Sequence, residues 1–170
     1  ATLPILIIGF FLRDFVEIYL RNQNVIIFST IFFGVLLLLF DFLKKDRELN
    51  ELNWKDSLII GCFQIFALLP GASRSAVTIM GAFYLGFKNT TALKISFLLA
   101  IPTLCFIFIG ENLAINFQYD IGLTNLILTS LTSFLTAFFT IHFFLKLVHK
   151  IGFLPFVFYR ILLGLLLFFI

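Results

Sequence analysis

Two short apolar segments separated by a polar break constrain this chain most. Ser57–Leu69 and Arg74–Tyr84 are apolar and compatible with helix, and they contain 13 and 11 residues. At about 1.5 Å per residue they reach only about 20 and 16 Å, so neither crosses a hydrocarbon core about 30 Å thick. Pro70 disfavours helical geometry in the residue before it, and Gly71 permits a turn. The pattern predicts a re-entrant helical hairpin over residues 57–84, with its tip near mid-membrane.

The rest of the chain has the composition of an integral membrane protein. Of the 170 residues, 61% are hydrophobic and 12% are charged. We therefore predict an all-α, polytopic membrane protein, with residues 1–170 in one membrane domain. The net charge of +3 is assigned to membrane topology and not to a nucleic-acid partner. Four further segments are long enough to span the bilayer: Val25–Leu43, Thr91–Ile109, Leu123–Leu147 and Phe153–Ile170.

The beginning of the chain indicates a fragment. The apolar run Leu3–Leu12 has ten residues, whereas a spanning helix needs about 20, and Ala1 is not an initiator methionine. We expect the chain to be the C-terminal portion of a longer protein that starts inside a transmembrane helix. Cys62 and Cys105 lie in apolar runs without metal-ligand spacing, and we expect them to be buried free thiols.

Loop charges predict the orientation of the hairpin. The side opposite to its base keeps Arg13 and Arg21, and the loop Gly110–Ile121 there carries Glu111 and Asp120 without Lys or Arg. The positive-inside rule then places the base in the cytoplasm, with a tip cavity that could open outward. The basic residues on the base side are Lys44, Lys45, Arg47, Lys55, Lys88, Lys94, Lys146 and Lys150.

The residues at the predicted tip suit an anion. Gly71 to Ser75 lead into the N-terminus of the second short helix, where unpaired N–H groups and the helix dipole favour negative charge. Arg74 adds a planar guanidinium that can bind two phosphate oxygens, and an arginine this deep in apolar sequence marks a function. The tip is therefore predicted to hold a phosphate or diphosphate group. Hydroxyl donors come from Ser73, Ser75 and Thr78.

The other polar residues in apolar sequence carry weaker signals. Gln64 precedes Pro70 by one to two turns and is expected either to line the same cavity or to make an interhelical hydrogen bond. Arg160 is expected to be structural, by snorkelling or pairing with an acid. His142 and His149 are expected to be packing or interfacial residues and not metal ligands. Helix packing is expected for Ser57, Ser96, Thr103, Ser130, Thr132, Ser133 and Thr136.

Three motifs carry a resemblance to a known family. Residues 61–79 read GCFQIFALLPGASRSAVTI, residues 96–102 read SFLLAIP and residues 153–160 read FLPFVFYR. The first resembles the signature GxxQxxALxPGxSRSGxT of the undecaprenyl-diphosphate phosphatase family, also called the bacitracin-resistance protein family. The other two are similar to the family's FSFLLAIP and FxPFxxYR segments, in the same order.

The resemblance implies a hydrolase of the bacterial inner membrane that converts undecaprenyl diphosphate to undecaprenyl phosphate and phosphate, recycling the lipid carrier of peptidoglycan synthesis. It also implies an inverted-repeat, transporter-like fold with a site facing the periplasm, and a divalent cation, Mg²⁺ or Ca²⁺. In these terms Arg74 and Ser73 would be catalytic. Gly71, Ser75, Thr78 and Gln64 would bind substrate. Besides the substrate, the partners expected are membrane lipids, with a homodimer left open.

The chain departs from the family at two places. Ala76 stands where the family usually has glycine, and the first signature, ExxxE followed by PxSSxGH, is absent; Arg13 and Glu17 do not reproduce it. We therefore expect about half of a site, no metal ligands in this fragment, and no turnover by it alone. A transporter or lipid flippase is the main alternative, because broken helices also bind anionic cargo. The type-2 phosphatidic acid phosphatase class is another, but Arg74 lacks the downstream histidine of its motif.

Overall fold

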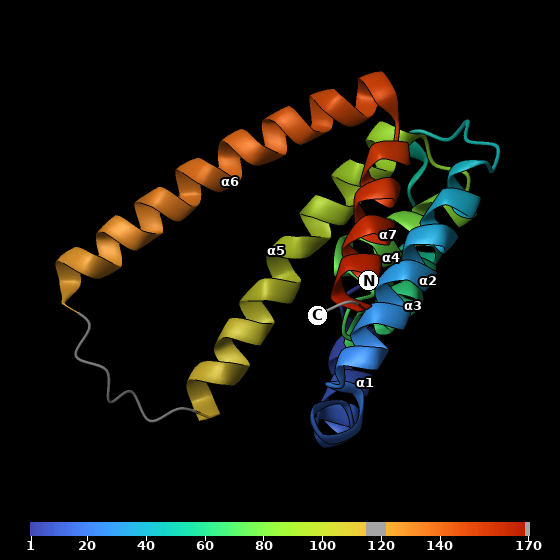
Figure 1. The fold of residues 1–170 in the computed structure, drawn as a ribbon. Coiled ribbons are helices and arrows are strands. Elements are labelled where there is room, and N and C mark those ends of the chain that lie inside the picture. The colour runs from blue at the N-terminus through green and yellow to red at the C-terminus, as the bar shows by residue number, and fades with distance from the viewer. Residues whose placement is uncertain (115–121, 169–170) are drawn as a thin grey trace.

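The computed structural model describes residues 1–114 and 122–168, with only the backbone described for 111–114. Within these residues the fold is helical, with one isolated β-bridge between Arg47 and Phe87. Short turns are η1 Val16–Leu20 (a π-helix), η2 Leu49–Glu51 and η3 Phe66–Leu68. The helices are α1 Leu3–Phe15, α2 Gln23–Asp41, α3 Trp54–Ile65, α4 Arg74–Tyr84, α5 Asn89–Ala114, α6 Leu123–Ile151 and α7 Leu154–Phe168 (Figure 1).

Three helices are long and apolar enough to cross a membrane: α2, the Asn89–Gly110 part of α5, and α6. They confirm the predicted all-α, polytopic membrane class. The fourth predicted span corresponds to α7, whose 15 described residues make it shorter. Helix α6 ends at Gly152, whose φ of 71° breaks it. The predicted end at Ile170, and the loop acids Glu111 and Asp120, lie outside the residues or side chains that the structure describes.

Helices α3 and α4 form a tightly packed hairpin. A Cβ added to Gly81 of α4 would lie 3.0 Å from the Cβ of Phe63 and 3.3 Å from the Cα of Ile60, so the two helices approach closely because position 81 has no side chain. Residues 69–73 form the turn between them, and α4 begins at Arg74, where the sequence predicts it.

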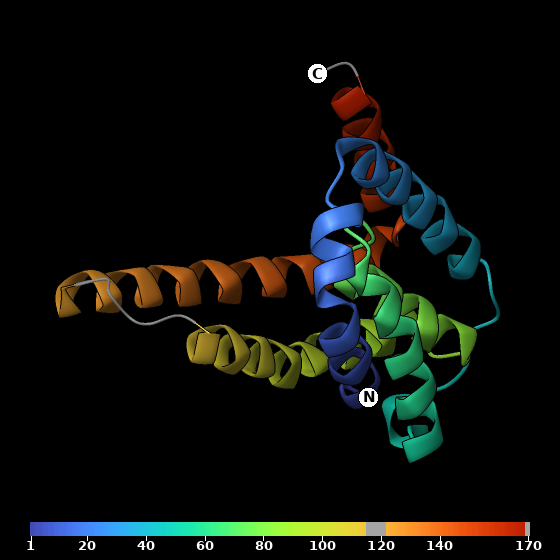
Figure 2. The same ribbon diagram turned by 90° about the horizontal axis from the view of Figure 1, so that it is seen from below.

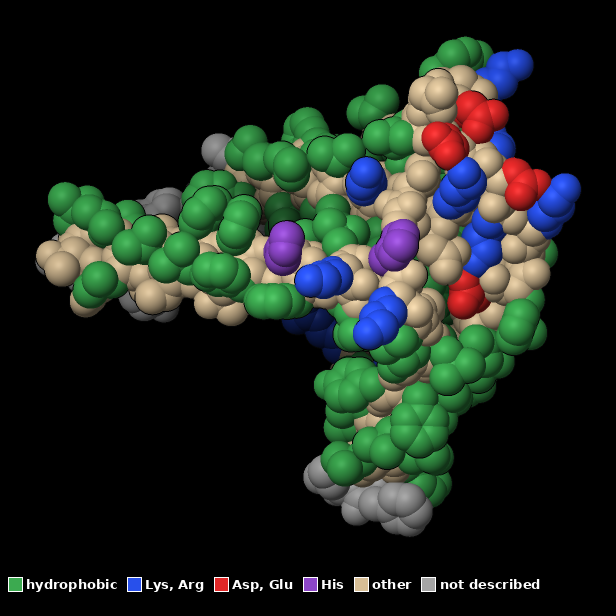
Figure 3. Space-filling view, turned by 90° about the horizontal axis from the view of Figure 1, so that it is seen from above, with side chains coloured by type: hydrophobic (Ala, Val, Ile, Leu, Met, Phe, Trp, Pro, Cys, Tyr) green, Lys and Arg blue, Asp and Glu red, His purple; other side chains and the backbone are tan. Residues whose placement is uncertain are grey.

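Arg47 ties the two ends of this hairpin together. Its Nη2 donates to Oδ2 of Asp56 at 2.6 Å, and its Nη1 donates to the carbonyl of Leu85 at 3.1 Å. Asp56 is buried and also accepts from the N–H of Asn53, the residue that caps α3. The guanidinium of Arg47 holds the pKa of the Asp56 carboxyl below its ordinary value. The base of the hairpin is therefore one end of the molecule, where Lys, Arg, Asp and Glu side chains gather (Figure 3).

The core lies where α2, α3, α4, α7 and the first part of α5 meet, around buried side chains such as Phe83, Phe87 and Phe153. Helices α5 and α6 meet through Phe97 and Phe144, whose ring centroids are 6.0 Å apart. Beyond that contact they extend away from the bundle (Figures 1 and 2). Helix α6 is exposed along most of its length within the described chain.

Two packing predictions are wrong for the described chain. Cys62 and Cys105 are exposed and not buried. The four hydroxyl residues predicted to pack on α6, Ser130, Thr132, Ser133 and Thr136, are exposed as well. The physical reason is the same, since an apolar run in a membrane protein can face lipid and therefore does not imply burial in protein. Thr132 does bond back to its own helix, at 2.9 Å from the carbonyl of Leu128.

Candidate functional site

The turn at the hairpin tip is held by side chains from distant helices. Ser29 of α2 donates a hydrogen bond to the carbonyl of Pro70. Arg160 of α7 donates from Nη2 to the carbonyls of Gly71 and Ala72, the second at 3.2 Å. These bonds satisfy main-chain carbonyls that would cost free energy if they were buried without a donor. Arg160 is thus structural, as predicted, but its partners are the tip carbonyls and not an acid.

Two residues of the turn have unusual backbone geometry. Gly71 has a φ of 90°, and a Cβ there would lie 2.7 Å from the carbonyl oxygen of Ile26 and from Oγ1 of Thr30. Ser73 has a φ of 65° and a ψ of 111°, which is strained for a residue with a side chain. The turn is therefore pressed against α2, and the neighbouring groups hold it in this strained conformation.

Ser73 caps α4, and its Oγ accepts from the N–H of Ala76 at 3.5 Å. The first N–H groups of a helix have no partner inside it, so those of Arg74 and Ser75 are the donors that this end offers to an anion. Ala76 is buried, and its methyl group lines the same cavity as Ser73 and Ser75. The N-terminus of α4 thus lies where the sequence predicts it, and its binding of an anion stays a prediction.

Arg74 turns toward α5. Its Nη2 donates to Oγ1 of Thr103 at 3.2 Å, and Nε2 of Gln64 donates to the same oxygen at 3.0 Å. Thr103 in turn donates to the carbonyl of Leu99 at 2.8 Å. Two buried atoms of this group, Nε of Arg74 and Oε1 of Gln64, have no hydrogen-bond partner among the described residues. Gln64 therefore makes an interhelical bond, which is the alternative to a cavity-lining role, and the structure brings it together with Arg74; substrate binding by Gln64 stays a prediction.

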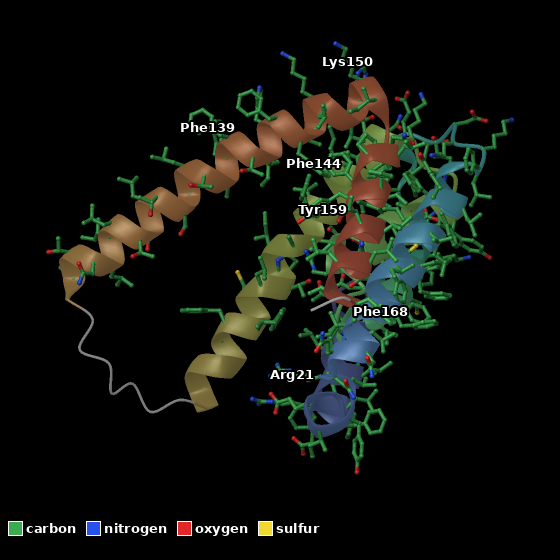
Figure 4. The ribbon with its side chains drawn as sticks, viewed as in Figure 1. Arg21, Phe139, Phe144, Lys150, Tyr159 and Phe168 are labelled. Carbon is green, nitrogen blue, oxygen red and sulfur yellow. The ribbon has the colours of Figure 1, made fainter. Side chains whose placement is uncertain are left out.

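Ser73 and Ser75 turn to the opposite side of α4. Their hydroxyl oxygens are 3.2 Å apart, and both residues line a cavity of about 170 Å³ against α6 and α7. Phe144 and Tyr159 also line this cavity, and Figure 4 labels both. A neighbouring cavity of about 190 Å³ shares Ser75 and Phe144 and is otherwise mostly apolar. The hydroxyls therefore face a mostly apolar space between helices, which Arg160 also lines.

Thr78 is separated from both groups. It is fully buried, and its hydroxyl lies 2.7 Å from Oγ of Ser96 and bonds back to the carbonyls of Arg74 and Ser75. In this arrangement its hydroxyl joins α4 to α5 and is not directed into a cavity. The packing role predicted for Ser96 agrees with this contact.

A larger and more polar cavity, of about 470 Å³, lies on the α5 side of the tip. Thr103 and Leu68 line its inner part, and Arg13, Glu17 and Arg21 line it from α1 and the turns that follow. Thr103 thus stands between this cavity and Arg74. The more polar cavity therefore lies on the α5 side of the tip, and the mostly apolar cavities lie on the side of α6 and α7.

The described residues do not gather a metal site, since no group of three or more His, Cys, Asp or Glu with suitable proximity occurs among them. His142 and His149 lie exposed on α6. The described residues therefore offer no group of three such ligands for the divalent cation that the resemblance implies.

Sequence reasoning missed the roles of Ser29 and Thr103. Both are hydroxyl residues in apolar helices, where close packing is the ordinary interpretation. Their partners lie 41 and 29 residues away along the chain. The only signal in the sequence was Pro102, which precedes Thr103 and leaves the carbonyl of Leu98 without its helical donor.

Comparison with known proteins shows the family of the chain. The chain matches the family described as Bacitracin resistance protein BacA over residues 1–166. It is 41% identical over 166 residues to the undecaprenyl-diphosphatase of Marinobacter nauticus, covering 96% of this chain and 63% of the relative. It is 42% identical over 172 residues to the undecaprenyl-diphosphatase of Aliivibrio salmonicida, covering 96% and 62%. The chain thus spans less than two thirds of these relatives. A match that extends over the broken hairpin, the turn around Arg74 and the closing Arg160 shows that the chain belongs to the BacA bacitracin-resistance protein family.

Proposed function

We propose that the protein carrying this chain hydrolyses undecaprenyl diphosphate to undecaprenyl phosphate and inorganic phosphate. One observation carries the proposal: Arg74 stands at the N-terminus of α4, between apolar helices, and no acidic side chain among those described forms an ion pair with it. A guanidinium in such surroundings calls for an anion. The names of the relatives supply the anion's identity, a lipid diphosphate.

In the proposed reaction, the bond from the terminal phosphorus to the bridging oxygen breaks, and in the net reaction water supplies the hydroxyl group of the inorganic phosphate and one proton. Negative charge then grows on the bridging oxygen, which leaves as part of undecaprenyl phosphate. Arg74 and the N–H groups at the start of α4 stabilise this charge, which is the largest contribution that a protein makes to phosphoryl transfer. Ser73 and Ser75 add hydroxyl donors at the edge of the apolar cavities, where the first units of the prenyl chain would lie.

The proposal includes a location. The base of the hairpin carries Arg47, Lys55 and Lys88, so the positive-inside rule favours a cytoplasmic base and a re-entrant hairpin. The polar cavity beside Thr103 then faces the opposite, periplasmic side of the inner membrane. A long prenyl chain among the apolar helices explains why the site is placed within the membrane.

A divalent cation belongs to the proposal only through the family resemblance. It would supply charge neutralisation on the phosphate oxygens. No step assigned here to Arg74, Ser73 or Ser75 depends on it, because the described residues do not form its ligand set. Chelation of the full-length protein followed by addition of Mg²⁺ or Ca²⁺ tests the requirement.

The deciding experiment measures phosphate release from undecaprenyl diphosphate by the purified full-length protein. Arg74→Ala should lower kcat/KM by at least about a hundredfold, since it removes a charge-assisted contact to the transition state. Arg74→Lys should retain part of the activity, because it keeps the charge but loses the fork. Lys150→Ala, which removes an exposed charge at the end of α6, should behave as wild type.

Near-normal activity of Arg74→Ala would contradict the assignment. The transporter alternative makes a different prediction, because a flippase would move the intact lipid between the leaflets of a vesicle without releasing phosphate.

A further inference from the structure

The hydroxyl of Thr103 lies where α3, α4 and α5 meet beside the hairpin tip. It is 1% exposed, accepts hydrogen bonds from Arg74 and Gln64, and donates its own proton to the carbonyl of Leu99. A hydroxyl has one proton and two acceptor positions, so every hydrogen-bonding capacity of this group is used. Its direction is therefore fixed by α5 and does not depend on a ligand.

Because the hydroxyl proton of Thr103 is given to Leu99, the ways in which Gln64 and Arg74 can donate to it are fixed as well. Because Thr103 gives its proton to Leu99, it can only accept from Gln64, and the amide must present Nε2 to it. The guanidinium of Arg74 donates to the remaining lone pair through Nη2. Thr103 thus holds one nitrogen of the guanidinium, Nη2, at a fixed position.

This anchor is neutral, which matters for an arginine that binds an anion. A carboxylate in the same place would hold Arg74 equally well but would cancel its charge. A hydroxyl leaves the charge uncompensated, and Nε of Arg74 is buried without a partner among the described residues. The guanidinium is thereby located and still has donors for a diphosphate.

We propose that Thr103 is a positioning residue for Arg74, which locates the guanidinium against α5 without neutralising it. The proposal rests on the proposed function in one respect, that the ligand of Arg74 is the diphosphate. Because its three hydrogen bonds use all of its capacity, the Thr103 hydroxyl has none left for the substrate, and its effect is exerted through Arg74.

The kinetic test compares three variants of the full-length protein. Thr103→Val keeps the shape and removes the hydroxyl, and we expect kcat/KM for phosphate release to fall about tenfold to a hundredfold, as for a lost hydrogen bond to a charged group. Thr103→Ser keeps the hydroxyl and should therefore retain most of the wild-type kcat/KM. Thr132→Val is the matched control, because Thr132 makes the same bond to its own helix but lies exposed on α6. Thr103→Ala gives the same comparison should the valine variant not fold.

A double-mutant cycle separates positioning from general structural damage. In an Arg74→Lys background, Thr103→Val should change kcat/KM by less than about twofold, because the interaction that it removes is already altered. An equal loss in both backgrounds would overturn the proposal.

Nitrogen NMR of the guanidinium groups gives a readout that does not need turnover. The chain has five arginines, Arg13, Arg21, Arg47, Arg74 and Arg160, so the Nε signal of Arg74 can be assigned by Arg74→Lys. Thr103→Val should shift or broaden this signal, and Thr103→Ser and Thr132→Val should not. An unchanged signal in Thr103→Val would overturn the positioning role. A wild-type protein that releases no phosphate but shows the expected NMR changes would instead contradict the proposed function.

Discussion

At the scale of single residues, the turn of the hairpin combines strain with dense contact. Ser73 is the only residue other than glycine that has a positive φ in the described chain. Such a conformation persists only when neighbouring groups enforce it. Here the enforcing groups are Ser29 on α2 and Arg160 on α7, which bind the carbonyls of the three preceding residues.

Relief of this strain should separate stability from activity. Ser73→Gly allows the positive φ without steric cost, and glycine is also an acceptable helix cap. We expect the free energy of unfolding to stay the same or to rise by up to about 1 kcal/mol. Phosphate release should nevertheless fall, because the hydroxyl is lost. Thermal unfolding in detergent and the phosphate assay together check this, and a stabilised variant with full activity would remove Ser73 from the site.

Gly71 and Gly86 allow steric contact to be distinguished from backbone strain. Their φ angles are similar, 90° and 82°. A Cβ at Gly71 would collide with Ser29, Ile26 and Thr30, whereas one at Gly86 would have nothing nearer than 3.7 Å. Gly86→Ala should cost about 1 kcal/mol of unfolding free energy, and Gly71→Ala at least about 3 kcal/mol in total. Equal midpoints in a thermal unfolding series would show that the turn is not pressed against α2.

At this scale the sequence predicts the chemistry but not the partners. Arg74 and its neighbours are recognisable because charge and small polar residues are rare in apolar sequence. That Arg74 faces Thr103 while Ser75 faces Phe144 depends on which helices surround α4. Those contacts bridge residues far apart in the chain, and no local pattern encodes them.

At the scale of elements, the hairpin depends on its base as well as its tip. Arg47 is bound to the start of α3 and to the residue after α4, and its guanidinium also lies 4.3 Å from the ring centre of Phe87. The loop before α3 thus closes the open end of the hairpin. Local signals explain why the boundaries of α4 are predictable, since Pro70, Gly71 and the cap Ser73 all lie within five residues of its start.

The ion pair at this base should give the hairpin an acid-sensitive component. The pKa of Asp56 is lowered in the folded protein, chiefly by its hydrogen bond to Arg47. Its contribution to stability is therefore complete above the ordinary pKa of an aspartate, about 3.9, and is lost as the pH falls further through the lowered pKa. Asp56→Asn should reduce stability at pH 7 by about 2 kcal/mol.

The measurement is thermal unfolding between pH 7 and pH 3 for the wild type and for this variant. The difference between the two should shrink toward the acid end of the range. A difference that is independent of pH would show that the loss comes from packing and not from the charge on Asp56.

At the scale of the whole molecule, charged side chains and exposed apolar side chains lie on different parts of the structure. Arg21 and Lys150 lie at opposite ends of the protein (Figure 4). The exposed apolar face of α6 is suited to lipid or to another polypeptide chain. Composition is enough to predict this membrane class, because only helices and closed barrels satisfy the backbone in lipid. The direction of α6 relative to the bundle is not predictable in this way, since composition does not encode which helices contact one another.

The proposed orientation can be measured with single cysteines. In a background with Cys62 and Cys105 replaced by alanine, Arg21→Cys should react with a membrane-impermeant maleimide in intact spheroplasts. Lys150→Cys should react only after the membrane is permeabilised, because the hairpin base is proposed to be cytoplasmic. The reverse pattern would place the polar cavity on the cytoplasmic side.

The bonds from Arg160 to the tip also set an order of events during synthesis. Gly71 and Arg160 are 89 residues apart in the chain. At a synthesis rate of about 5–20 residues per second, the ribosome makes the tip roughly 5 to 20 seconds before the arginine that completes it. During that interval α3 and α4 can form, but the carbonyls of Gly71 and Ala72 lack their donor. The turn of residues 69–73 is therefore among the last parts of this chain to mature, and a nascent chain halted before α7 would contain the hairpin without its finished tip.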